Sequence, residues 1–154
     1  MASQPLDTET ESLELGVLTE LAGYHLRRAS GAFAADFSRV LAGTGMRQVL
    51  FGILSVVDAN PGINQGAAGR MLGIQRANMV ALINELVDKD WIERKVAADD
   101  RRAFALTMAP AGSAKLAECL ARIRAHEEEM LSDLSAADRT RLIALLGKIE
   151  AKEK

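Results

Sequence analysis

Residues 60–109, NPGINQGAAGRMLGIQRANMVALINELVDKDWIERKVAADDRRAFALTMA, are the stretch that decides the fold. The spacing of apolar residues predicts two short helices, at 64–72 and 75–89. Two helices that cross closely need a small residue in the first helix and a turn-forming residue between them. Gly69 and Gly73 meet these two needs. The stretch therefore predicts a helix-turn-helix.

The pattern that follows changes from a helical period to a period of two. Residues 92–96 and 102–108 are predicted to form two strands, joined by a short polar turn. A two-stranded ribbon directly behind a helix-turn-helix is a wing. The predicted fold class is thus mainly α with a small β wing, built around a winged helix-turn-helix domain at 46–109.

Helices flank this domain on both sides. Apolar residues recur at helical spacing from Leu13 to about Leu41, and again from Pro110, a residue favoured at a first helical position, to Leu134. Ser135 then starts a last helix as a capping residue, with Asp138 three residues later. The polar, acidic residues 1–12 predict a disordered tail.

Charge and composition exclude several classes of protein. The 154 residues hold 19 basic and 21 acidic side chains, a net charge of −2, so the whole chain shows no bias toward nucleic acid. The longest apolar run, residues 49–57, is far shorter than the roughly 20 residues that a membrane span needs. The acidic N-terminus is unlike a secretory signal, so we expect a cytoplasmic protein without a membrane partner.

The reactive residues are few. Cys119 is the only cysteine, and His25 and His126 are the only histidines, so neither an intrachain disulfide nor a Cys/His zinc site is possible. No nucleophile–base order and no phosphate-cradling glycine loop is present. We expect no cofactor, no metal and no enzymatic activity.

The start of the second helix of the motif carries the candidate base-reading residues Gln75, Arg76 and Asn78, while Val80 and Ile83 are expected to point back into the core. Arginine pairs with guanine in the major groove, and asparagine or glutamine pairs with adenine. These three polar residues are hypothesised to read bases; the alternative is an ordinary solvated helix face.

Further DNA contacts are possible around this helix. Met79 either touches a thymine methyl group or fills the core. Asn64 and Gln65 either bind phosphate or simply cap their helix. At the tip of the wing, Arg101 and Arg102 either reach a minor groove or brace the wing itself.

More specific motifs lie between Pro61 and Gly112: the turn Leu72-Gly73-Ile74, the step Asp90-Trp91-Ile92-Glu93-Arg94 into the wing, and an Asp-x-Arg at Asp100 and Arg102. In these motifs the sequence resembles the MarR (multiple antibiotic resistance regulator) family of winged-helix transcription factors. The resemblance covers about residues 15–150. The sequence departs from the family pattern at three alanines, Ala68, Ala77 and Ala109.

The resemblance implies a homodimer that binds double-stranded DNA at a near-palindromic operator, with two recognition helices one DNA turn apart. The flanking helices would then interlock with those of a partner. The implied organisation is a tail at 1–12, a helical dimerisation region formed by 13–45 and 110–154, and the winged helix-turn-helix domain at 46–109.

Family members often bind a small aromatic acid between the dimer helices and the winged domain. The corresponding effector-binding candidates here are Tyr24, His25, Arg27 and Arg28, with one arginine pairing with the anion; the alternative is a basic pair on a helix surface. One branch of the family senses peroxide through a cysteine near the N-terminus. Cys119 lies far from that position and is expected to be a buried thiol.

The sequence thus predicts a dimeric regulator, a repressor released by a small aromatic acid or its coenzyme A thioester, in aromatic catabolism. Two alternatives remain open. One is a ligand-independent or redox-controlled regulator of the same fold, and the other is a winged-helix adaptor that binds a protein instead of DNA.

Overall fold

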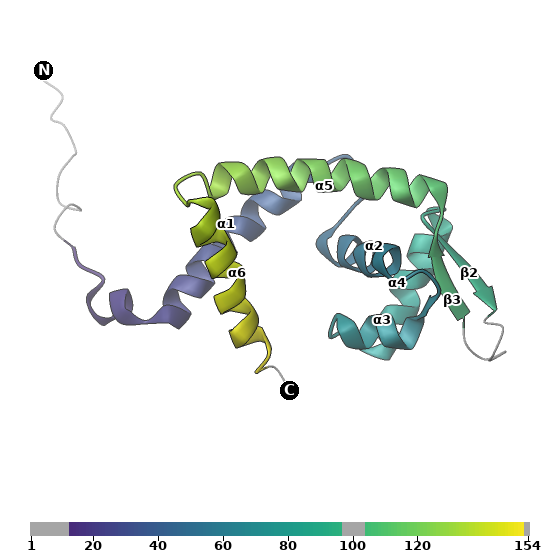
Figure 1. The fold of residues 1–154 in the computed structure, drawn as a ribbon, viewed down its shortest axis with the longest axis horizontal. Helices are drawn as coiled ribbons and strands as arrows, with labels where there is room; N and C mark the ends of the chain where they lie inside the picture. The colour runs from purple at the N-terminus through teal and green to yellow at the C-terminus, as the bar shows by residue number, and fades with distance from the viewer. Residues whose placement is uncertain (1–12, 97–103, 153–154) are drawn as a thin grey trace, which may run out of the picture. The chain divides into compact units, whose positions relative to one another are not determined.

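The computed structural model describes residues 13–96 and 104–152, which form a mainly helical fold with a small antiparallel sheet (Figure 1). The winged helix-turn-helix class predicted from the sequence is confirmed. The elements in these residues are η1 (Gly16–Glu20), α1 (Ala22–Val40), α2 (Gln48–Ala59), β1 (Ile63–Asn64), α3 (Gln65–Met71), α4 (Arg76–Asp88), β2 (Ile92–Val96), β3 (Phe104–Met108), α5 (Pro110–Met130) and α6 (Ala136–Glu150). Among the helices of residues 13–96 and 104–152, none combines the length and the apolar character that a membrane span requires.

Two compact units divide the chain, Met1–Ala35 and Asp36–Lys154. In the first unit, the single helix predicted from Leu13 onward is wrong. Gly16 has a φ of +58°, and Leu21 is extended with φ −95° and ψ 105°, so a 3₁₀ turn precedes α1. The sequence placed the boundaries of the winged domain after residue 45 and before residue 110, which differs from the division after Ala35. Those domain boundaries stay predictions.

The core of the second unit is formed by α2, α4, β3 and α5. In α2 the apolar residues recur at helical spacing and bury one face, while α4 contributes every third or fourth residue. The largest fully buried side chains are Leu50, Ile53, Leu54, Val57, Met79, Ile83, Leu86, Ile92, Leu106 and Cys119. The prediction that Cys119 is a buried thiol is confirmed.

The crossing of α3 and α4 depends on the two glycines that the sequence singled out. A Cβ at Gly69 would lie 3.2 Å from the carbonyl oxygen of Ile74 and 3.5 Å from Cγ of Met79. Gly73 has a φ of +65°, a conformation that L side chains rarely adopt. Gly69 therefore allows the close approach of the two helices, and Gly73 allows the turn between them.

The sheet has three strands in the order β1-β3-β2, whereas the sequence predicted two. Ile63 of β1 pairs with Leu106 of β3, and Ile92 of β2 pairs with Met108. A two-residue strand is too short to show an alternating pattern, so β1 is recognisable only once β3 lies beside it. The second predicted strand began at 102, and residues 102–103 lie outside the described residues.

Helix α5 starts at a tight junction with the end of α4. Ala109 is its N-cap and makes no side-chain capping bond, and Pro110 occupies the first turn, as predicted. The N–H of Ala109 instead donates to the carbonyl of Trp91 at 3.0 Å. Gly112 packs so closely on Trp91 that an ideal Cβ would lie 1.9 Å from that carbonyl oxygen.

The beginning of the second unit is also tied to α5. Nη1 of Arg122 donates to the carbonyls of Val40 and Ala42, each at 3.4 Å. The buried His126 places Nε2 3.6 Å from a carboxylate oxygen of Asp36. These contacts explain why the last residues of α1 belong with the winged domain.

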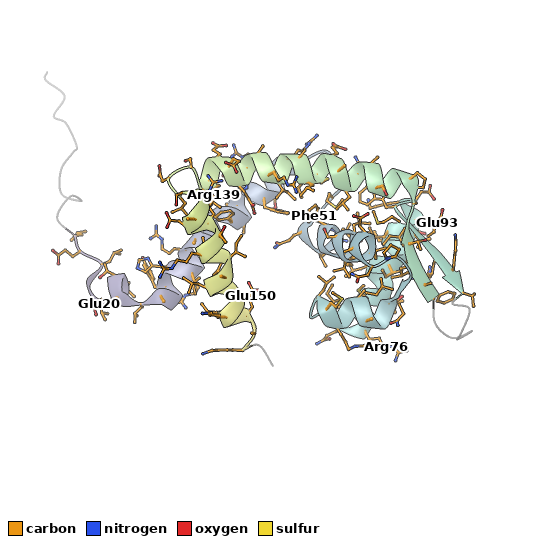
Figure 2. The ribbon with its side chains drawn as sticks, in the orientation of Figure 1. Glu20, Phe51, Arg76, Glu93, Arg139 and Glu150 are labelled. Carbon is orange, nitrogen blue, oxygen red and sulfur yellow. The ribbon has the colours of Figure 1, made fainter. Side chains whose placement is uncertain are left out.

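The turn between α5 and α6 is held by Arg139, which lies beside it (Figure 2). Its guanidinium donates to the carbonyls of Leu131 at 2.9 Å and Leu134 at 3.2 Å, and to a carboxylate oxygen of Glu128 at 2.6 Å. The prediction that α5 continues through Leu134 is wrong, because the helix ends at Met130. The predicted cap is confirmed, since Oγ of Ser135 accepts from the Asp138 N–H at 3.1 Å.

Replacing Arg139 by Ala should lower the free energy of unfolding by about 1–2 kcal/mol, because two carbonyls lose a charged donor. Chemical denaturation of the wild type and Arg139→Ala measures this difference. Glu128→Gln is the matched control, because it keeps both carbonyl bonds and should cost less. Equal stability of Arg139→Ala and the wild type would contradict the role assigned to Arg139.

The same pair predicts a pH dependence. The hydrogen bond and the charge of Arg139 hold the pKa of Glu128 below its ordinary value. The stabilisation from this carboxylate is therefore complete above the pKa of the unfolded carboxyl, and it is lost as the pH falls through the lowered native pKa. The melting temperatures of the wild type and Glu128→Gln should differ at about pH 7 and converge once the pH has fallen below the lowered native pKa of Glu128.

Candidate nucleic-acid interface

The start of α4 presents polar side chains to solvent. Gln75 is the N-cap, and its side chain makes no capping hydrogen bond, so its amide is not used to begin the helix. Arg76 and Asn78 follow in the first turn and are exposed. The free N–H groups of a helix N-terminus also favour phosphate. The three predicted base-reading residues therefore share one accessible helix end.

The structure decides how the next two residues face. Met79 is only 1% exposed, so of the two roles considered for it the core position is the one observed. Val80 was expected to point into the core, and this is wrong, because it is 42% exposed. The reason is the close crossing at Gly69, which leaves space that the Met79 side chain fills.

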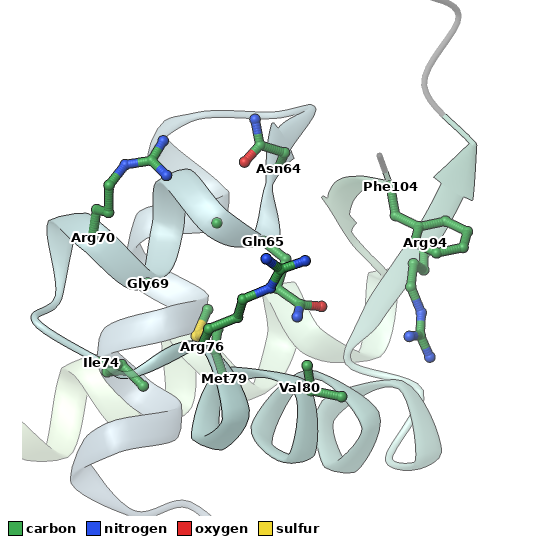
Figure 3. A pocket seen from close by; sticks show the side chains of 11 residues that line it. Asn64, Gln65, Gly69, Arg70, Ile74, Arg76, Met79, Val80, Arg94 and Phe104 are labelled. Atoms are coloured by element: carbon green, nitrogen blue, oxygen red, sulfur yellow. The ribbon is translucent and has the colours of Figure 1, made fainter. Parts of the chain in front are cut away.

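A groove of about 550 Å³ lies between α3, α4 and the wing (Figure 3). Its lining combines side chains that are widely separated in the sequence. The lining residues are Asn64, Gln65, Gly66, Gly69, Arg70, Ile74, Arg76, Met79, Val80, Arg94 and Phe104.

The charge of this groove has one sign. Arg70 of α3, Arg76 of α4 and Arg94 of β2 contribute three cations, and no carboxylate lies among the lining residues that the structure describes. The Arg94 guanidinium carbon lies 5.5 Å from the centre of the Phe104 ring, a cation–π arrangement that orients it. A groove lined by cations from three elements suits a polyanion.

Asn64 and Gln65 lie at the edge of the same groove. Oδ1 of Asn64 accepts from the Ala67 N–H at 2.8 Å, so the capping role considered for this residue is present. This cap uses only the Oδ1 oxygen of the Asn64 side chain, and the Nδ2 amide takes no part in it. Phosphate contact by Asn64 and Gln65 stays a prediction. Arg101 and Arg102 lie outside the described residues.

The first unit brings three of the four effector-binding candidates together. Nη1 of Arg28 donates to the Tyr24 hydroxyl at 3.2 Å, and its guanidinium carbon lies 5.9 Å from the centre of that ring. The rings of Tyr24 and His25 meet edge to face with centroids 5.4 Å apart. One cation, one hydroxyl and two aromatic rings thus share one side of α1.

Arg27 lies apart from this cluster. Its guanidinium extends along α1 to within 3.5 Å of the position that a Cβ at Gly23 would occupy. One ring nitrogen of His25 is already used within the first unit, because its Nε2 donates to the carbonyl of Thr19 at 3.0 Å. Of the two arginines, Arg28 is therefore the one held next to an aromatic hydroxyl.

Neither metal chemistry nor a reactive thiol has support within the described ranges. Across 13–96 and 104–152, no three His, Cys, Asp or Glu side chains are grouped so as to hold a metal ion. Cys119 is fully buried, which argues against redox control through this thiol.

Sequence relatives decide the family. Over 147 residues, the chain is 31% identical to a protein of Thauera aromatica assigned as the transcriptional regulator of the hcr operon, and the match covers 95% of this chain and 89% of that protein. The chain belongs to the MarR family. A profile of that family matches residues 45–103, the helix-turn-helix and the start of the wing.

Solved structures agree with this MarR assignment. The repressor CouR, bound to a 23-mer DNA duplex, is 33% identical with a TM-score of 0.84, over 90% of this chain and 99% of that one. CouR bound to p-coumaroyl-CoA is 32% identical with a TM-score of 0.76, over 93% of this chain and 100% of that one. The relatives are transcriptional regulators, which agrees with the prediction that this MarR-family chain is not an enzyme.

The groove residues that the sequence alone did not predict as contacts include Arg70, Val80, Arg94 and Phe104. Arg70 is the one charged residue of α3 and Arg94 stands between Glu93 and Lys95 in β2, and nothing in either local pattern joins these arginines to Arg76. A search for Arg near every element of the motif would have found them, but only the fold places them around one groove.

Proposed function

We propose that this chain is a homodimeric repressor that binds a near-palindromic operator in double-stranded DNA and is released by a small aromatic acid or its coenzyme A thioester. Gln75, Arg76 and Asn78 read bases, and Asn64 and Gln65 contact the backbone. Arg101 and Arg102, on sequence grounds alone, reach the minor groove from the wing.

The observation that carries this proposal is the groove with Arg70, Arg76 and Arg94 around it, in which every charged side chain among the described lining residues is a cation. The whole chain has a net charge of −2. The three arginines beside α4 therefore concentrate positive charge locally in a chain that is slightly acidic overall. The DNA-bound state of CouR adds support from a 33% identical relative.

The homodimer is supported by apolar side chains that the single chain leaves exposed. No residue of α6 is buried, although the helix carries Ile143 at 71%, Leu145 at 49% and Ile149 at 52% exposure. In the first unit, Leu13, Val17 and Leu21 are 79%, 65% and 47% exposed. Exposed apolar helix faces of this kind mark association surfaces.

Fluorescence anisotropy tests the DNA proposal. The purified full-length protein is titrated against the DNA immediately upstream of its own gene and against a scrambled duplex at near-physiological salt. We expect tighter binding to the upstream DNA, with an affinity that falls steeply as salt rises because phosphate counterions are released. Sedimentation of the same sample should give a dimer.

Two other outcomes have clear meanings. Equal weak binding to both duplexes would place the operator elsewhere, and a genomic selection would then find it. No binding to any DNA by a folded dimer would contradict the proposal and favour the protein-binding adaptor.

For the effector, we propose that Arg28 pairs with the anionic group and that Tyr24 and His25 contact the aromatic ring. The hydrogen bond between Arg28 and Tyr24 fixes the cation beside an aromatic surface. CouR, with p-coumaroyl-CoA bound, is a 32% identical precedent for an aromatic thioester. Arg27 is retained as the alternative cation.

Arg28→Ala should weaken effector binding by about 10- to 100-fold, because a charge-assisted hydrogen bond is lost. Calorimetry with hydroxycinnamates, benzoates and their coenzyme A thioesters measures this change. Arg27→Ala, made in parallel, decides between the two arginines, and Arg124→Ala on α5 controls for loss of a positive charge. Heat from none of these ligands would rule out an aromatic effector.

A further inference from the structure

Helix α4 exposes a valine where a polar DNA-reading helix face is expected. Val80 is 42% exposed and lies one helical turn after Arg76, so the two side chains share a face. Both line the groove beside the wing, together with the 43% exposed Phe104 (Figure 3). Among the described lining residues of this cationic groove, Val80 and Phe104 are the exposed large apolar side chains.

The outward position of Val80 is fixed by the fold and is not a free rotation of the helix. Met79 is buried against Gly69, whose missing Cβ would lie 3.5 Å from the methionine Cγ. With Met79, Ile83 and Leu86 turned to the core, the next residue along from Met79 must face the groove. The helix cannot turn Val80 inward without expelling Met79.

We propose that Val80 reads the 5-methyl group of a thymine in the major groove, once in each half-site of the operator. The inference rests on the proposed DNA binding and adds a specificity-determining residue to it. The thymine methyl is the apolar group on the major-groove edges of the bases, and an apolar side chain recognises it by contact. Arg76, one turn earlier on the same face, supplies the polar contact to a neighbouring base.

The surroundings of Val80 favour DNA over an apolar partner. The groove takes cations from three elements, at Arg70, Arg76 and Arg94, and within residues 13–96 and 104–152 its lining includes no carboxylate. Phosphates pair with Arg70 and Arg94 when a duplex enters, and the bases then face Arg76 and Val80 on the helix. The stacking of Arg94 on Phe104, at 5.5 Å, keeps that cation at the wing side of the groove.

The test replaces thymines of the operator one at a time by deoxyuridine, which differs only in lacking the 5-methyl group. Affinities are measured by anisotropy with the full-length protein. For the wild type, we expect about a three- to fivefold loss at one thymine in each half-site, the value of one buried methyl group. Deoxyuridine at the other thymines should change little.

Val80→Ala, combined with the deoxyuridine operator, completes a double-mutant cycle between the protein side chain and the thymine methyl group. This variant should bind the thymine operator about three- to fivefold more weakly and should show no further loss on the deoxyuridine operator. Its salt dependence should equal that of the wild type, because no phosphate contact is removed. Arg76→Ala is the matched comparison: it should weaken binding to both operators while the thymine preference persists.

Two results would overturn the methyl contact while leaving DNA binding intact. One is an unchanged wild-type affinity with every half-site thymine replaced. The other is a deoxyuridine penalty of equal size in the wild type and Val80→Ala. Failure to bind any DNA would instead overturn the proposed function, and the methyl contact with it.

Discussion

Gly112→Ala is expected to destabilise the fold by about 3–5 kcal/mol, the largest effect of any single methyl group considered in this protein. The added Cβ would lie 1.9 Å from the carbonyl oxygen of Trp91 and 2.7 Å from its carbonyl carbon. Both are backbone atoms, so no side-chain rotation relieves the overlap. The same carbonyl accepts the 3.0 Å bond from Ala109 that begins α5, so moving α5 away also breaks this bond.

Thermal unfolding followed by circular dichroism measures the effect, and a melting temperature lower by roughly 10 °C is expected. Gly52→Ala in α2 is the matched control. Its Cβ would lie 3.6 Å from Cδ2 of Leu72, an ordinary contact, and alanine favours a helix over glycine by up to about 1 kcal/mol. Gly52→Ala should be as stable as the wild type or more so, and an unchanged Gly112→Ala would contradict the close packing.

Arg76→Ala is expected to weaken operator binding by about 5- to 150-fold, or roughly 1–3 kcal/mol, and to relax the base preference at one position of each half-site. Arg76 is exposed in the first turn of α4 and lines the groove. An arginine placed there can donate two hydrogen bonds to a guanine, and alanine donates none. Competition binding against operators with every base at each position measures both quantities.

Arg124→Ala controls for net charge in that experiment. Arg124 is exposed on α5 and is not among the groove residues, so its loss should change operator affinity little. Arg102→Ala, from the wing, should instead weaken binding evenly across sequences. If Arg76→Ala also weakened binding evenly, Arg76 would contact phosphate and would not read a base.

Several features followed directly from the local sequence. Gly69 and Gly73 indicated the close crossing of α3 and α4, because only a residue without a side chain fits such positions. Ser135 and Asp138 indicated the start of α6, because a helix cap needs only residues a few positions apart. The MarR resemblance, confirmed by the relatives, followed from the motifs between Leu72 and Gly112.

Other features depended on partners that no local pattern reveals. β1 has two residues and exists because β3 pairs with it. The end of α5 at Met130 is decided by Arg139, which reaches back to the carbonyls of the turn from the next helix. The pairing of Arg28 with Tyr24, and not of Arg27, is set by which side of α1 each residue faces.

In the candidate site, too, some features follow from the local sequence and others from tertiary contacts. The polar residues of the recognition helix and its position behind a turn were determined by the sequence, because helical period and turn chemistry act over a few residues. The facing of Met79 and Val80 was decided by tertiary structure, since adjacent apolar residues at 79, 80, 82 and 83 fit more than one rotation of a helix. The space left at Gly69 selects the rotation that buries Met79. Likewise, the gathering of Arg70, Arg76 and Arg94 around one groove required the wing to fold beside α4, because each charge alone is an ordinary surface arginine.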